Sequence, residues 1–61
     1  MSTRDLPERI RTRREHLGWR RENLAANLGV SFTTVTRWER GSSTPTGLYL
    51  TKVLEWLKEG E

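Results

Sequence analysis

The side chains of this sequence that are able to do chemistry are mostly arginines, together with several hydroxyls and a single histidine. The chain has no cysteine, and His16 has no second ligand placed near it, whereas a metal site needs three or four. The serines and threonines have no neighbouring base to activate them as nucleophiles. A phosphate-cradling glycine motif is also absent. We therefore expect no enzyme, no cofactor, no metal and no small-molecule ligand, which leaves the binding of anions by arginine.

The basic residues are concentrated in the first two-thirds of the chain. Residues 1–40 carry nine of the eleven basic side chains and five acidic ones, whereas residues 41–61 carry two basic and three acidic ones. The formal net charge of the whole chain is +3. A basic bias of this kind is the electrostatic footprint of a protein that binds a polyanion. Arginine is also a good solvated helix residue, so the charge alone leaves both interpretations open.

Four helices are expected to position these side chains. Apolar residues recur at helical spacing, and they place the helices at about residues 6–17, 21–28, 31–40 and 46–58. A glycine follows each of the first three, as in a left-handed helix cap, and Ser31 is a good residue type for starting the third. No segment alternates as a strand would. The fold class is therefore all-α, and the length of 61 residues allows one domain, residues 1–61.

The apolar residues of these helices predict the core. In the fourth helix they form a stripe of Leu50, Val53, Leu54 and Leu57. Trp19 and Trp38 are also expected in the core. Tyr49 and Trp56 lie seven residues apart beside the stripe. They either extend the core or form a two-fold dimer contact, and the sequence leaves both interpretations open.

The joint between the second and third helices is the most informative part of the sequence. Two helices that meet at a steep angle need a small residue where their backbones approach, and Ala25 supplies it. The turn needs a residue that accepts a positive φ, and Gly29 adopts it at little cost. Val35 and Trp38 follow at the spacing that docks the next helix on the first. This order is the spacing of a DNA-binding helix-turn-helix.

At this joint the chain resembles the phage-repressor family of the lambda repressor and Cro type, the xenobiotic-response-element-like helix-turn-helix domains. The resemblance runs from about residue 6 to residue 57, and its most specific pieces are residues 22–31, residues 35–41 and Pro45. It implies a compact bundle of four or five helices whose third helix enters the major groove of DNA. A family mark is an arginine of the first helix paired with a glutamate at the end of the third, here Arg14 and Glu39.

The register of the resemblance assigns the DNA contacts. It implies base contacts by four residues of the third helix: Phe32, Thr33, Thr36 and Arg37. Arg37 suits a bidentate contact with guanine, while Phe32 and the Thr33 methyl suit thymine methyl groups. Contacts with the DNA backbone are implied for Arg20, Arg21, Ser31, Thr34, Arg40, Ser42 and Ser43.

The second helix opens differently from the family pattern. Relatives usually have Ser or Thr and then Gln at its start, where this chain has Arg20 and Arg21. The glutamine normally bridges a phosphate to a side chain of the third helix. Arginine also reaches a phosphate, so we expect stronger attraction to the backbone and a steeper salt dependence. Arg11 and Arg13 are expected to lie on a solvated face of the first helix.

Together these expectations predict a sequence-specific regulator of transcription that binds double-stranded DNA. The simplest version is a repressor of its own operon, in a phage or mobile element, that binds a pseudo-palindromic operator as a homodimer. The alternative is an antitoxin or another interaction module that uses the same fold to hold a partner protein. No apolar run is long enough to cross a membrane, which predicts a cytoplasmic protein without a membrane partner.

Overall fold

The computed structural model describes residues 6–59. This part of the chain forms four helices: α1 (Leu6–His16), α2 (Arg21–Leu28), α3 (Phe32–Arg40) and α4 (Gly47–Glu59). The predicted all-α class is confirmed, and each helix lies within one or two residues of its expected bounds. The ends of the expected domain, residues 1–5 and 60–61, lie outside the described residues.

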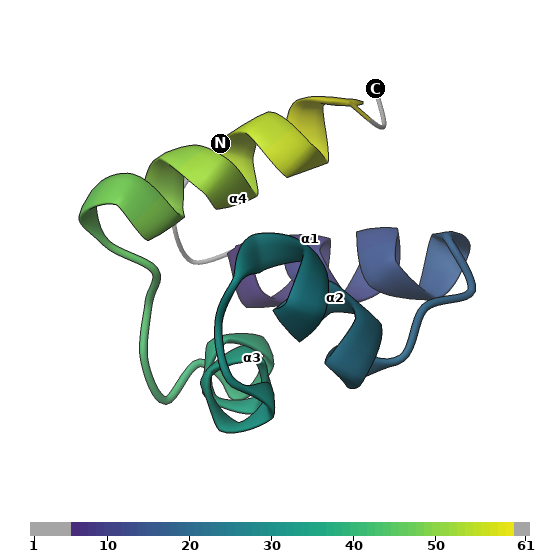
Figure 1. Cartoon of the computed structure of the whole chain (residues 1–61), viewed down its shortest axis with the longest axis horizontal. Coiled ribbons are helices and arrows are strands. Elements are labelled where there is room, and N and C mark those ends of the chain that lie inside the picture. Colours follow the sequence, from purple (N-terminus) through teal and green to yellow (C-terminus); the bar gives the residue numbers. More distant parts are fainter. Residues whose placement is uncertain (1–5, 60–61) are drawn as a thin grey trace.

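The four helices are arranged so that α3 and α4 lie on opposite sides of the molecule, with α1 and α2 between them (Figure 1). Both α1 and α2 contact α3, and both also contact α4. The bundle measures 25 × 24 × 20 Å. Because α3 rests on two helices through one side, its opposite side is left bare.

The core contains apolar residues from all four helices. Its members are Leu6, Ile10, Leu24, Ala25, Leu28, Val35, Trp38, Val53, Trp56 and Leu57. Burying side chains of this size stabilises the fold by about 1.5–3 kcal/mol each. A chain of 61 residues can bury only a small core, so each of these contributions is a large part of the total.

The turn between α2 and α3 has the geometry that the spacing predicts. Gly29 adopts a φ of 74°, and its N–H donates to the carbonyl of Ala25. The N–H of Val30 donates to the same carbonyl at 2.9 Å. Ala25 itself is buried, which allows the two helices to approach closely. Ser31 is the N-cap of α3 rather than its first helical residue, because its side chain accepts a hydrogen bond from the Thr34 N–H at 3.1 Å.

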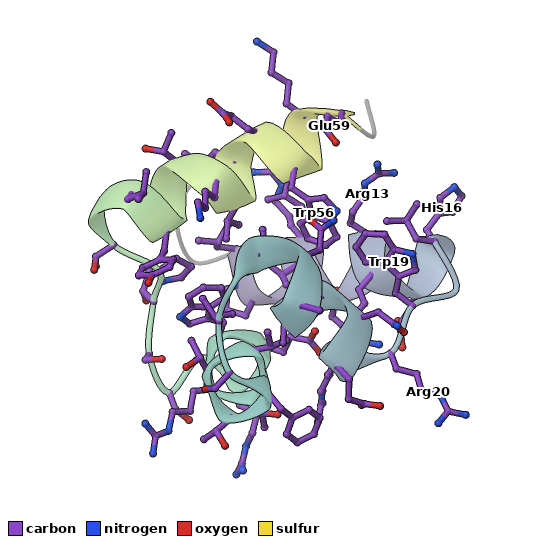
Figure 2. The ribbon with its side chains drawn as sticks, in the orientation of Figure 1. Arg13, His16, Trp19, Arg20, Trp56 and Glu59 are labelled. Carbon is purple, nitrogen blue, oxygen red and sulfur yellow. The ribbon has the colours of Figure 1, made fainter. Side chains whose placement is uncertain are left out.

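The structure corrects two expectations about the core. Leu54 was expected in the apolar stripe of α4 but is 45% exposed, because the buried side of this helix is centred on Val53, Trp56 and Leu57. Trp19 is only partly buried, at the edge of the core. Leu54 is left outside because Trp56 turns inward and stacks on Trp19, with ring centroids 6.1 Å apart and an interplanar angle of 16° (Figure 2). Trp56 therefore belongs to the core and is covered where a dimer contact would need it exposed.

Candidate functional site

The bare side of α3 holds most of the residues expected to contact DNA bases. Val35 and Trp38 point into the core, and the helix is therefore strongly amphipathic. Phe32, Thr33 and Arg37 are exposed. Phe32 is a large apolar residue that is 48% exposed, on a small protein that needs every apolar group it can bury. Its exposure stabilises nothing in the isolated domain and leaves an apolar ring available to a ligand.

The start of α3 is held by a pair of hydroxyls. Ser31 Oγ accepts from the Thr34 N–H at 3.1 Å, and it lies 2.8 Å from Thr34 Oγ1. One hydroxyl hydrogen is used in the bond between the two oxygens, so one of the two remains free to donate elsewhere. The same pair can therefore cap the helix and donate one hydrogen bond to a phosphate.

Thr36 differs from the other residues of this face. It is half-buried, and its hydroxyl oxygen is covered without a hydrogen-bond partner among residues 6–59. The accessible part of Thr36 is therefore not its hydroxyl. A base contact by this residue in the observed rotamer would not use its hydroxyl.

The other end of α3 is anchored by a buried carboxylate. The side chain of Glu39 is 1% exposed, and the ion pair expected between it and Arg14 is present. Arg14 Nε donates to Glu39 Oε2 at 2.7 Å, and Arg14 Nη2 donates to Glu39 Oε1 at 3.0 Å. The remaining Arg14 nitrogen donates to the carbonyl of Trp19 at 2.9 Å. The hydrogen bonds to Glu39 raise the pKa of Arg14 above its ordinary value.

A second arginine reaches the same carboxylate, which the sequence did not indicate. Arg21 Nε donates to Glu39 Oε1 at 3.2 Å, and the Arg21 side chain is 37% exposed. Glu39 on α3 therefore joins α1 through Arg14 and α2 through Arg21. No sequence signal marks this contact, because the two residues are 18 positions apart and lie on different helices.

The remaining residues expected to contact the DNA backbone lie on loops and helix ends. Arg20 is the N-cap of α2, where its own N–H donates to Asn23 Oδ1 at 2.8 Å. Its side chain extends away from the body of the molecule (Figure 2). Arg40, Ser42 and Ser43 are exposed after the core-facing part of α3. The N–H groups of both serines donate to the carbonyl of Arg37, at 2.9 and 3.4 Å, which holds this loop close to the helix.

On α4, Tyr49, expected either to extend the core or to form a dimer contact, is 44% exposed. Its ring lies 6.5 Å from that of Trp38, and Lys52 Nζ lies 5.8 Å from its centre. A hollow that the sequence did not indicate lies between α2 and α4. It is lined by Asn27, Leu28, Lys52, Glu55, Trp56 and Glu59.

Residues 6–59 offer neither a metal-binding cluster nor a membrane-spanning helix. No group of three or more His, Asp or Glu side chains lies together there in a way that could hold a metal ion. No helix of this part of the chain is long and apolar enough to span a membrane.

Comparison with known proteins adds evidence independent of this geometry. The sequence profile described as Helix-turn-helix matches residues 10–58. The chain is 41% identical, over its whole length, to the HTH-type transcriptional regulator DicA of Escherichia coli (strain K12), and covers 52% of that protein. It is 40% identical over 90% of its length to Repressor protein C2 of Salmonella phage P22, and covers 27% of it. The chain thus spans about half of one curated relative and about a quarter of the other. No solved structure matches it.

Proposed function

Since the chain belongs to the helix-turn-helix family, as a phage-repressor-like domain, we propose that it binds double-stranded DNA and regulates transcription. The observation that carries the proposal is the bare side of α3, which presents Phe32, Thr33 and Arg37 to solvent on a helix whose other side is buried. An α-helix of this kind fits the major groove, where the base pairs are distinguishable.

In this proposal the residues divide into readers, which contact the edges of bases, and positioning contacts, which bind the DNA backbone. Phe32 and the methyl groups of Thr33 and Thr36 contact apolar edges such as thymine methyls, and Arg37 donates to guanine. The backbone contacts come from Arg20, Arg21, Ser31, Thr34, Arg40, Ser42 and Ser43, which carry little sequence information themselves. Three of the arginines, Arg20, Arg37 and Arg40, are exposed in the structure.

We further propose that the domain acts as a repressor of its own operon and occupies its operator as a homodimer. One small module buries little DNA surface, so a dimer on two half-sites is the efficient way to gain affinity and selectivity. The contact between protomers would use the exposed apolar residues of α4, which are Leu48, Tyr49 and Leu54. The names of the two relatives, a transcriptional regulator and a phage repressor, support the regulatory role.

The test is a fluorescence-anisotropy titration of the protein against its own upstream region and against a shuffled duplex of equal length, at several salt concentrations. We expect the native duplex to bind at least about a hundredfold more tightly at physiological salt, toward the low end of the usual range for specific binding. Sedimentation of the same complexes measures how many protomers each duplex carries.

Equal binding to both duplexes, lost as salt rises, would contradict sequence-specific recognition, because only phosphate contacts would then remain. In that case the interaction with a partner protein becomes the better proposal, with the exposed apolar residues of α4 as its surface. Co-purification with a protein encoded beside it would then be measured.

A further inference from the structure

The arrangement of charges around Glu39 is unbalanced in a way that points beyond a structural ion pair. One carboxylate, almost fully buried, receives two guanidinium groups. Arg14 alone donates to both carboxylate oxygens, so it already satisfies the pairing that the fold needs. The contact with Arg21 is additional, and it places a second guanidinium group on one carboxylate at the junction of α1, α2 and α3.

The geometry of Arg21 shows how that charge is presented. Its Nε, the nitrogen nearest the stem, donates inward to Glu39 Oε1 at 3.2 Å. The two terminal nitrogens have no hydrogen-bond partner within residues 6–59, and 37% of the side chain is exposed. Guanidinium is planar and rigid, so fixing Nε also fixes the direction in which the terminal N–H groups point. Arg21 is therefore held at one end with its other end free.

From this we infer that Glu39 is a positioning residue for Arg21, and that the terminal nitrogens of Arg21 form a pre-oriented clamp for one DNA phosphate. The inference rests on the proposed function, and it assigns to the buried carboxylate a role in binding as well as in folding. A lysine carries its three donors on one atom at the end of a flexible stem, so it lacks the planar fork whose inner nitrogen contacts the carboxylate while the outer nitrogens face a phosphate.

The contact between Arg21 and Glu39 should strengthen the binding of a phosphate by Arg21. A flexible surface arginine loses rotamer freedom when it binds a phosphate, which weakens the contact. The contact of Arg21 with Glu39 restricts that freedom before any phosphate binds. Because Glu39 belongs to the helix that carries the readers, the phosphate clamp and the reading face also have a fixed mutual orientation.

The experiment compares Arg21→Gln, Arg21→Lys and the control Arg11→Gln, each titrated by fluorescence anisotropy against the tightest duplex that the wild-type protein selects from a randomised pool. Arg11 is an exposed arginine of α1, so the control removes the same charge from a solvated site. For Arg21→Gln we expect affinity about tenfold lower at 100 mM salt. We also expect the slope of log affinity against log salt to fall by about 0.9 per bound protomer, because a glutamine that still reaches the phosphate carries no charge and releases no counterion. Arg11→Gln is expected to stay within about twofold of wild type.

Arg21→Lys separates positioning from charge. If Glu39 orients the guanidinium, the lysine variant loses most of the affinity that the glutamine variant loses. Wild-type affinity for Arg21→Lys would overturn the positioning role, because charge alone would then suffice. An unchanged salt slope for Arg21→Gln would overturn the phosphate contact itself. If the wild-type protein showed no specific binding at all, the proposed function would fail instead, so the two failures are distinguishable.

A measurement on the unaltered protein covers the case in which a variant does not fold. In nitrogen-15 spectra of the free protein, the Nε–H groups of Arg14 and Arg21 should exchange with water more slowly than that of Arg11, because both donate to Glu39. Adding the selected duplex should then slow the terminal N–H groups of Arg21. Fast exchange at Arg21 Nε in the free protein would contradict the pre-orientation.

Discussion

The two ends of α3 are built on opposite principles. At the C-terminal end, Glu39 is buried and shares its carboxylate with arginines of α1 and α2. At the N-terminal end, Ser31 and Thr34 are hydrogen-bonded to each other, and Phe32 and Thr33 are exposed. The C-terminal end therefore sets where the helix lies, whereas the exposed Phe32 and Thr33 of the N-terminal end can vary with little effect on the fold. In a DNA-binding helix this separation lets sequence preference change while docking geometry stays constant.

The largest expected effect breaks the anchored end. Glu39→Ala removes the partner of two guanidinium groups, and an unpaired buried charge costs about 3–5 kcal/mol. In a domain of this size a loss of that magnitude removes most of the free energy of unfolding. We therefore expect no cooperative thermal transition above room temperature in far-UV circular dichroism. Glu55→Ala, an exposed glutamate of α4, is the matched control and should melt like wild type. A fall in Tm of less than about 5 °C for Glu39→Ala would show that the anchor matters little.

The next largest expected effect concerns Phe32, at the exposed N-terminal end of α3. Phe32→Ala should leave Tm unchanged within about 3 °C, since the ring is 48% exposed in the free protein. Covering roughly 50 Å² of this ring against DNA would contribute about 1.3 kcal/mol, so the variant should bind its selected duplex about tenfold more weakly. Anisotropy titrations measure the binding and circular dichroism the folding. A variant that loses stability but not affinity would place Phe32 in the fold rather than in the interface.

The smallest expected effect concerns Thr36, which lies between the two ends of α3. Thr36→Val replaces the covered, unpartnered hydroxyl with a methyl group of similar size, so the free energy of unfolding should rise by about 1 kcal/mol. DNA affinity should stay within about twofold of wild type. Thr36→Ser keeps the hydroxyl and removes the methyl, and it should lower both quantities. If the valine variant bound weakly and the serine variant normally, Thr36 would rotate on binding and read a base through its hydroxyl. Urea unfolding and anisotropy titrations provide both readouts.

Much of the fold was predictable because it depends on local signals. Gly29 and Gly41 adopt positive φ where the sequence placed the ends of helices, and Ser31 caps α3 through its own side chain. These features depend on residues within a few positions of one another, so their spacing along the chain is sufficient evidence. The pairing of Arg14 with Glu39 spans 25 positions, and only the family resemblance indicated it.

The failures share a tertiary cause. Leu54 and Trp56 are both apolar and only two positions apart, and periodicity alone does not decide which of them turns inward. The stacking of Trp56 on Trp19, a residue of the loop between α1 and α2, places Trp56 inside and leaves Leu54 exposed. The direction in which a helix faces depends on the shape of what it packs against, and that shape is formed by residues distant in sequence.

Local residue patterns were sufficient to predict that this chain forms helices, where the helices end, and that the second and third meet in a helix-turn-helix joint. Which groups are available to a ligand followed from the packing of the helices: Arg21 is held at one end by Glu39, the hydroxyl of Thr36 is covered, and Trp56 is buried. Helix formation and capping depend on neighbours within one turn. Accessibility and charge pairing depend instead on helices that meet only after the chain has folded.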